Sequence, residues 1–484
     1  MSSYDGTLML GREYPPTLTW SDAMDIKSQI ERDRTKAFYG LLVERLGEGI
    51  WEERKAAYIE RIRVRESQFN IELPVEPQLF VPTEDDIDWY LMASYLSHTF
   101  PHSDSAYSSK RIYPYAMAIG AVASEIRRIP HVEGVLDKML ANNNQPEKQI
   151  FELLTASFYI KNGYDVSFIP ENSITWPDGK TKKSPDMLVR FGDLEFYVEC
   201  KRADKQTKYS QVEEQAWAGI WSHLSYHLLR VAPWCIVDIT FHESVTEVAA
   251  ERVVEVVNQA IKEPLGRATS ALLTAEARVI DKKGLKRHYR EFSVRPNSPQ
   301  QELLVFGNID SNQKRSIATV AKRVIRPGTN NDVLNLYVKD VANCVGAQWR
   351  CNHEESLRLR SRHFKGLVHD GVSQIPPGKA GIVHILYETR DGIEVEELRR
   401  DKNIENISNY DASESSALGV MLHSVNYYPL EDDYQWAETV DNFGRIPDLF
   451  DLYPCQTLMI ATDPTSEVPD ITHWQQDKKA RDTR

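Results

Sequence analysis

The chain has 484 residues, of which 41% are hydrophobic and 27% are charged. These values are ordinary for a globular protein of two to four domains, each long enough to bury a core. The formal net charge of −13 argues against a protein that coats nucleic acid nonspecifically, because its overall field repels phosphate. Any contact with nucleic acid must therefore be local.

The first 130 residues are predicted to form a helical N-terminal region. Thr83, with Asp86 three residues later, resembles a capping box that starts a helix, and the polar stretch 102–113 is expected to be a loop that could lie near an active site. Two apolar stripes at helical spacing predict helices in this region: Phe38, Leu41, Leu42 and Leu46, and Ile87, Tyr90, Leu91 and Tyr95.

The first thirty residues lack a basic start followed by an apolar core, and no run of 18 apolar residues occurs in the chain. We therefore expect a cytoplasmic protein with no membrane partner. The five cysteines, at positions 200, 235, 344, 351 and 455, are odd in number and scattered, which is typical of reduced thiols.

A helix followed by a strand is predicted from "QPEKQIFELLTASFYIKNGYDVSFI" (145–169). Pro146 suits the first turn of the helix, and Gly163 suits its C-terminal stop. An apolar stripe lines one side of this helix, and Glu152 lies on the opposite side with Ala156 and Tyr159. Both sides are therefore expected to be at least partly buried. The strand covers residues 164–169.

The segment "SPDMLVRFGDLEFYVECKR" (184–202) is predicted to form a β-hairpin with Gly192 and Asp193 as its two loop residues. In that register Asp186 faces Glu199. The Cβ atoms of directly opposed residues are only ~4.5–5.5 Å apart, so two like charges at such positions repel. Because side chains alternate along a strand, Lys201 shares a face with Glu199.

Two carboxylates and an amine at one point are suited to hold a divalent cation against a phosphodiester. Mg²⁺ is bound by one or two carboxylates together with waters and phosphate oxygens. Lys201 can then orient or deprotonate the attacking water, or stabilise charge that develops on the phosphate. The pattern favours phosphodiester hydrolysis. The alternative is an ordinary surface hairpin with a Glu–Lys pair on its exposed side.

Downstream of the hairpin, residues 210–231 are predicted to form a helix and residues 234–241 an apolar strand. The packing side of that helix is made by residues at helical spacing: Ala216, Ile220, Leu224 and Leu228. The order helix, strand, strand, strand, helix, strand predicts one mixed α/β sheet covered by helices.

This region, about residues 145–245, resembles the PD-(D/E)xK superfamily of restriction-endonuclease-like nucleases. Four features carry the resemblance: Pro185-Asp186, Glu199-Cys200-Lys201, the upstream helix with Glu152, and Gln215 on the following helix. Glutamine at that place resembles the exonuclease-like branch, but that branch expects an aromatic residue four positions later, where this chain has Gly219.

The resemblance implies a mixed-sheet nuclease core that uses Mg²⁺ or Mn²⁺. Asp186 and Glu199 would bind the metal, joined by the main-chain carbonyl of Cys200, and Glu152 would add to the metal shell. Lys201 would serve the nucleophilic water. Glu147, on the same helix as Glu152, is the rival for the helix acid.

The fold class predicted for the whole chain is α/β. A helical N-terminal region (1–130) precedes the nuclease-like core (131–265), and an α/β or β-rich domain (266–484) follows it. Five segments in this last domain read as strands: 302–309, 333–342, 378–388, 417–430 and 456–463. The last ~20 residues are polar and expected to be loose.

Two kinds of local cluster in the C-terminal part are candidate sites. Cys344, Cys351 and His353 lack a fourth ligand and the paired spacing of common zinc sites, so we expect no stoichiometric zinc. Two basic stretches, 282–290 and 357–366, could hold phosphates or be solvated charged faces. The second stretch is the denser, and its candidate nucleic-acid contacts are Arg358, Arg360, Arg362 and Lys365.

The sequence thus predicts a metal-dependent nuclease whose partner is nucleic acid, with DNA favoured. Superfamily analogy points to microbial restriction, repair or antiviral defence against mobile DNA. Two alternatives stay open. One is a catalytically inactive scaffold or nucleic-acid-binding module in a multiprotein complex, and the other is a phosphoesterase that acts on small molecules. Assembly with itself or with a partner protein is also open.

Overall fold

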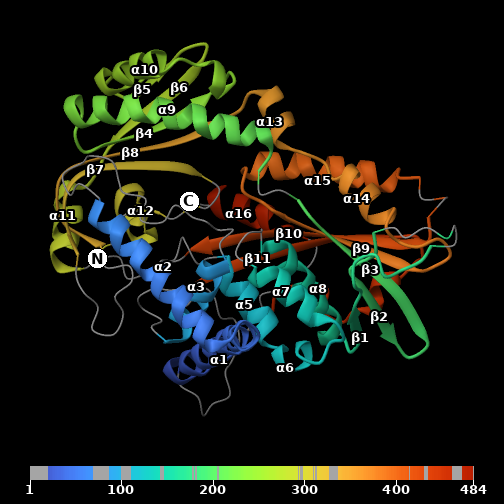
Figure 1. The fold of residues 1–484 in the computed structure, drawn as a ribbon. Coiled ribbons are helices and arrows are strands. Elements are labelled where there is room, and N and C mark those ends of the chain that lie inside the picture. The colour runs from blue at the N-terminus through green and yellow to red at the C-terminus, as the bar shows by residue number, and fades with distance from the viewer. Residues whose placement is uncertain are drawn as a thin grey trace.

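The computed structural model describes residues 20–68, 87–99, 111–141, 146–176, 179, 183–203, 206–292, 294, 298–308, 310, 313–325, 336–411, 413, 415–429, 434–460 and 471–482. These residues form a mixed α/β fold on two mixed β-sheets, one of six strands and one of five (Figure 1). The α/β class predicted from the sequence is confirmed. In the described part of the chain, no helix has the length and apolar character needed to cross a membrane.

The N-terminal region is helical in its described residues, as predicted. Phe38, Leu41 and Leu42 of the first predicted stripe are buried, and so are three of the four residues of the second stripe. The predicted capping box at Thr83 and Asp86 lies outside the described residues, as do positions 102–110 of the predicted loop. The helices are α1 (Trp20–Leu46), α2 (Glu48–Gln68), α3 (Ile87–Thr99), α5 (Ile112–Gly120), α6 (Ala123–Ile126) and α7 (Val132–Leu140).

The six-stranded sheet has the order β1-β2-β3-β9-β10-β11. Its strands are β1 (Asp165–Phe168), β2 (Met187–Phe191), β3 (Leu194–Arg202), β9 (Gly381–Glu388), β10 (Ala417–Pro429) and β11 (Tyr434–Gly444). The first three form an antiparallel meander, β9 is parallel to β3, and β10 is parallel to β9. β11 returns antiparallel to β10.

The hairpin between β2 and β3 has the predicted register. Phe191 pairs with Leu194, and Met187 pairs with Val198. Gly192, the first loop residue, has φ of 57°, which glycine adopts without steric strain in a tight hairpin turn.

Helices cover both faces of the six-stranded sheet. Helix α8 (Glu147–Lys161) packs on one face, against the buried side chains of Val198 and Cys200 on β3. The helices α14 (Lys365–Val372) and α15 (Ile393–Ser408) pack on the other face, against Val383 and Ile385 on β9. As predicted, α8 is buried on nearly all sides, because it lies between the sheet and the N-terminal helices.

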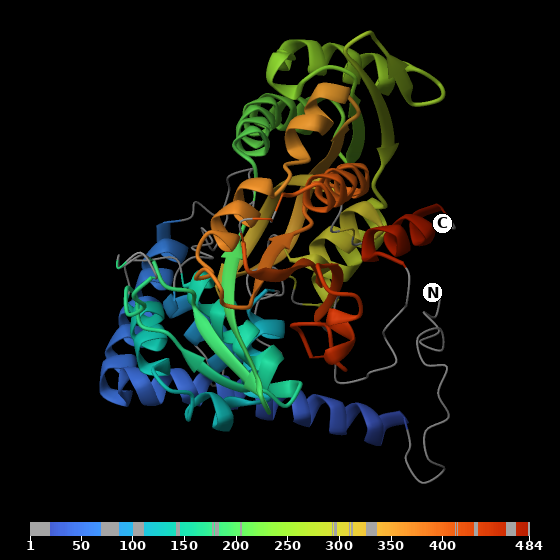
Figure 2. The same ribbon diagram turned by 90° about the vertical axis from the view of Figure 1, so that its right-hand side faces the viewer.

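The five-stranded sheet has the order β5-β6-β4-β8-β7. Its strands are β5 (Arg267–Thr269), β6 (Leu273–Val279), β4 (Cys235–Phe241), β8 (Leu336–Cys351) and β7 (Lys314–Ile325). The helices α9 (Lys208–Val231) and α10 (Ala250–Lys262) pack on one face, and a short 3-10 turn, η2 (Val245–Glu247), adjoins α9. The helices α11 (Lys282–Glu291) and α12 (Pro299–Phe306) pack on the other face. Figure 2 shows the green helices α9 and α10, which cover one face of this sheet, above the six-stranded sheet.

The prediction that strand 234–241 shares a sheet with the hairpin is wrong. This strand is β4, and it pairs with β6 and β8 in the five-stranded sheet. Residues 208–351 are therefore an insertion between β3 and its parallel neighbour β9, and the boundary expected at 265/266 falls inside the inserted sheet. An apolar run predicts that a strand is buried, but it does not say which sheet receives it.

Three local predictions in the C-terminal part are also wrong. Residues 302–309, read as a strand, contain the end of α12, which Ser298 caps and Gly307 ends with a φ of 84°. Residues 456–460 form no strand, because the backbone N–H groups of Leu458 and Met459 bind the Glu438 carboxylate instead. The tail forms α16 (His473–Asp482), whose Trp474 is buried. The remaining short helices of this part are α13 (Glu354–Arg360) and the 3-10 turn η3 (Leu449–Leu452).

Candidate active site

Asp186 lies directly before the first residue of β2 and meets Glu199 on the neighbouring strand β3. The last paired residues of the hairpin are Met187 and Val198, so the next position on each strand brings Asp186 opposite Glu199. Asp186 Oδ2 accepts a hydrogen bond of 2.7 Å from the backbone N–H of Cys200. The carboxylate thus accepts from a β3 N–H just before β2 begins, at a position where no β2 residue pairs with Cys200.

Glu199 is buried and makes a close ion pair with Lys201 on the same face of β3. Lys201 Nζ lies 2.6 Å from Glu199 Oε1, and the two side chains are 12% and 1% exposed. The other carboxylate oxygen of Glu199, Oε2, has no hydrogen-bond partner among the described residues. Buried carboxylate oxygens are normally paired, so the unpaired state of this atom needs an explanation.

Glu152 approaches the pair from α8. Its carboxylate is buried, and Lys148, one helical turn earlier, lies 3.7 Å away at Nζ. The rival acid Glu147 is already neutralised, because Arg111 and Arg202 lie 2.7 Å and 2.8 Å from its two oxygens. The structure therefore distinguishes the two helix acids.

Burial raises the pKa values of the three carboxyl groups at this site, and the charge of Asp186 adds to the shifts of the other two. Burial, followed by the charge of Asp186, raises the pKa of Glu152 to about 8 and that of Glu199 to about 8. Burial also raises the pKa of Asp186, although the Cys200 amide opposes this shift. Burial lowers the pKa of Lys148, but the neighbouring carboxylates, those of the site together with Glu171, outweigh that effect and raise it. Such shifts are expected where several acids occupy one poorly solvated place.

Lys148 is the residue at this site that sequence reasoning missed. Its spacing of four residues from Glu152 was the available signal, because side chains at i and i+4 lie on one face of a helix. Cys200 adjoins the acids through its backbone, whereas its thiol is buried in the opposite direction and burial raises the pKa of that thiol.

Gln215 is not near this site. It is exposed on α9, a helix that packs against the inserted sheet and not against the hairpin. The prediction carried Gln215 into the site by assuming that the helix after the hairpin covers the same sheet. In the structure, α14 is the helix that packs against both β3 and β9.

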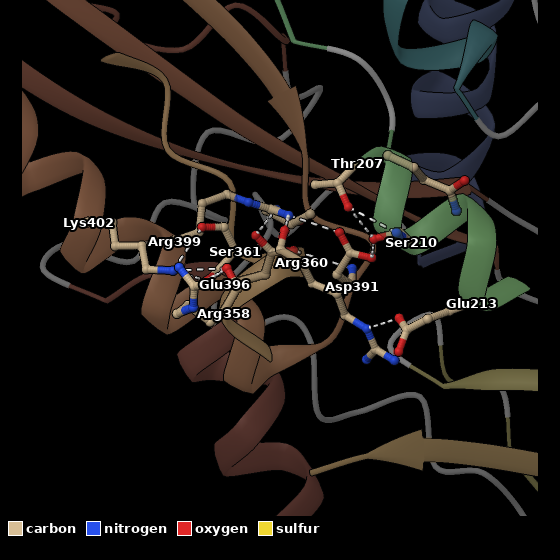
Figure 3. A network of polar contacts seen from close by, with 12 residues as sticks. Thr207, Ser210, Glu213, Arg358, Arg360, Ser361, Asp391, Glu396, Arg399 and Lys402 are labelled. Carbon is tan, nitrogen blue, oxygen red and sulfur yellow. Dashed lines mark hydrogen bonds and ion pairs between the residues drawn. The ribbon is translucent and has the colours of Figure 1, made fainter. Parts of the chain in front are cut away.

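The basic stretch 357–366 is partly a structural element and not a uniformly free surface (Figure 3). Arg360 is buried and makes a close ion pair with buried Glu213 of α9, so its assignment as a phosphate contact is wrong. Arg358 is exposed, but its Nε and Nη2 groups donate to the two carboxylate oxygens of Glu355, at 2.6 Å and 2.5 Å. Arg362 and Lys365 are exposed, and Arg362 also lines a small pocket beside Arg399, Thr207 and Glu388.

Cys344 and Cys351 point to opposite faces of β8. Cys344 packs with α11 and α12, and Cys351 packs with α9 and α10. Seven residues of a strand span roughly 23 Å. The two thiols therefore cannot share one metal ion, whatever His353 does.

The side chains at the hairpin site offer few ligands for a divalent cation. Among the described residues, no group of three or more His, Cys, Asp or Glu side chains lies close enough to hold a metal. Mg²⁺, however, needs only one or two carboxylates, and completes its shell with waters and substrate oxygens. The free Oε2 of Glu199 and the carboxylate of Asp186 beside it fit that requirement.

Comparison of the chain with models of protein families, with curated proteins and with solved structures gave no match.

Proposed function

We propose that this protein is a metal-dependent nuclease that hydrolyses phosphodiester bonds of nucleic acid, with DNA as the favoured substrate. One observation carries the proposal. The carboxylates of Asp186 and Glu199 lie side by side at the end of a hairpin, and Lys201 contacts Glu199 on the same face. A pair of crowded, poorly solvated carboxylates costs stability, and a cation would relieve that cost.

The arrangement of the elements around the hairpin supports the PD-(D/E)xK reading. An antiparallel meander of three strands is followed in the same sheet by β9, parallel to β3. Helix α8 packs on one face of these strands and α14 on the other. The helix and strand predicted to complete this core from residues 210–241 are replaced by α14 and β9, more than 120 residues further along the chain.

Asp186 and Glu199 would hold Mg²⁺ or Mn²⁺, with Glu152 as an additional acid. When bound, the ion would polarise the phosphodiester and lower the pKa of a coordinated water. Lys201 would position the attacking water or neutralise charge on the phosphate, and for this it must exchange its contact with Glu199 for one with the substrate. Asp186 is held in place by the Cys200 amide, so its position needs no rearrangement.

The decisive experiment measures cleavage of labelled DNA and RNA against Mg²⁺ concentration for the wild type, Asp186→Ala and Glu199→Ala. We expect metal-dependent cleavage by the wild type and none by either variant, because each change removes a carboxylate that holds the ion. Both variants should remain folded, since removal of one of two crowded carboxylates also relieves repulsion. Asp193→Ala is the matched control, because this exposed aspartate lies in the loop of the same hairpin.

Wild-type activity in the Asp186 and Glu199 variants would contradict the site assignment. Turnover of nucleotides with none of polynucleotides would instead favour a phosphoesterase that acts on small molecules.

The second candidate function is a scaffold or nucleic-acid-binding module that keeps the fold without the chemistry. The observation that favours it is the Glu199–Lys201 ion pair, in which the lysine proposed for catalysis already has a carboxylate partner. A folded wild type that cleaves no DNA or RNA with Mg²⁺ or Mn²⁺ would support this candidate.

A further inference from the structure

Helix α11 presents a basic face that the proposed active site does not use. Successive residues of an α-helix are rotated by about 100°, so five of its side chains fall within about 140° of its circumference. These five are Lys282, Lys283, Lys286, Arg287 and Arg290. Leu285 and Tyr289, on the adjoining face, are buried and fix the helix to the inserted sheet.

The five cations have no acidic partner among the described residues, although the protein as a whole carries a net charge of −13. Arg358, in the denser basic stretch, is by contrast bound to Glu355, and Arg360 is bound to Glu213. The two basic stretches are therefore alike in sequence, but they differ in whether their basic side chains are paired with acidic ones. Of these two stretches, as far as the structure describes them, α11 is the one that carries several cations without an acidic partner.

Aromatic groups accompany this charge. The amines of Lys282 and Lys286 lie 5.2 Å and 5.7 Å from the centre of the Trp234 ring, which packs under the helix. Phe292, directly after α11, is 54% exposed, and its ring centre lies 4.6 Å from that of His288. Cations beside an exposed ring are suited to a nucleic-acid backbone and its bases.

We propose that the basic face of α11 is a docking surface for the phosphate backbone of nucleic acid. The choice of nucleic acid over another polyanion rests on the proposed function. Figure 1 places α11 and the hairpin at opposite sides of the molecule. The face therefore binds a stretch of nucleic acid remote from the bond at the active site, so it should raise affinity for long substrates and leave the chemical step unchanged.

The test is a triple variant, Lys283→Gln, Arg287→Gln and Arg290→Gln, which leaves the two lysines on Trp234 in place. Binding of a fluorescent DNA duplex of about 40 base pairs is measured by fluorescence anisotropy in EDTA, over a series of salt concentrations. The loss of three phosphate contacts should weaken binding at least about tenfold and reduce the salt slope by roughly three.

The matched control removes the same charge where acids compensate it. Arg252, Arg267 and Arg358 are all exposed and paired with Glu255, Glu276 and Glu355. Changing these three arginines to glutamine should alter affinity and salt slope much less than the α11 variant. Thermal melts of both triple variants establish that they are folded.

Equal losses in the two triple variants would overturn the docking surface, because they would reflect only the general field of the protein. Unchanged affinity in the α11 variant would overturn it as well. Binding of polyglutamate and of anionic lipid vesicles is measured for the wild type and the α11 variant in the same way. If the variant loses as much affinity for either of these as for the duplex, or more, nucleic acid is not the ligand. Because binding is read in EDTA, this result is separate from the cleavage assay that tests the active site.

Discussion

The carboxylate of Asp186 is bound to the backbone N–H of Cys200, one residue beyond Glu199 on the neighbouring strand. A charged side chain at this place would be repelled by Glu199 and pushed toward solvent if nothing held it. The amide fixes it instead. The two acids are thus held together by the ladder of the hairpin before any ion or substrate arrives, which is the property a preorganised site requires.

Lys201 should affect the chemical step and not metal binding. Lys201→Ala removes a positioned cation but leaves the carboxylates, so we expect the cleavage rate at saturating Mg²⁺ to fall by about 10²-fold or more. The Mg²⁺ concentration for half-maximal activity should not increase. A variant with normal rate and weakened metal dependence would contradict this role.

The metal-free protein should lose stability as pH rises from about 4.5 to about 8. The folded-state pKa values of Glu152 and Glu199 are raised to about 8 from ordinary values of 4.5. The folded state therefore binds more protons than the unfolded state in this interval, and the free energy of unfolding falls as these protons are lost. Urea unfolding in EDTA across this pH range measures the effect.

Glu152→Gln with Glu199→Gln should flatten that pH dependence, whereas Glu195→Gln, on the exposed part of the same hairpin, should not. Mg²⁺ binding should strengthen as pH rises toward 8, because the ion displaces the same protons. A metal affinity that does not change with pH would show that these carboxyl groups are not its ligands.

The pair Arg360 and Glu213 should be important for stability. Both side chains are buried, and the pair joins α13 to α9 of the inserted region (Figure 3). Arg360→Ala leaves the Glu213 carboxylate buried without a partner, which costs about 3–5 kcal/mol. Urea unfolding measures it, with Arg358→Ala as the control, since Arg358 is exposed and its loss should change little. Equal stability of the two variants would refute the structural role of Arg360.

The contact between α1 and α5 should not tolerate a side chain at Gly120. A Cβ atom there would overlap the backbone carbonyl of Arg34, which cannot move without shifting α1. Gly120→Ala should therefore destabilise the protein by about 1–3 kcal/mol. Gly134→Ala on α7 is the control, because its Cβ would meet no atom within 4 Å, and alanine favours helix by up to about 1 kcal/mol. Thermal or urea unfolding of the two variants decides the point.

The sequence alone determined the features that depend on neighbours in the chain. The two-residue loop and the alternation of side chains set the register that brings Asp186 opposite Glu199, and the Pro146 and Gly163 signals bounded α8. Two local signals competed at residues 302–309. The apolar content predicted a strand, but Ser298 and Gly307 are the residues that begin and end a helix there.

Only the tertiary structure decided which distant segments complete the sheet and which charges are buried. β9 takes the place beside β3 although 178 residues separate Arg202 from Gly381, and β4 belongs to another sheet. Arg360 and Arg358 are two residues apart, yet one is buried against Glu213 and the other is at the surface. Apolar and basic patterns predict burial or exposure on average, but strand pairing and ion pairing depend on partners that only the folded chain brings together.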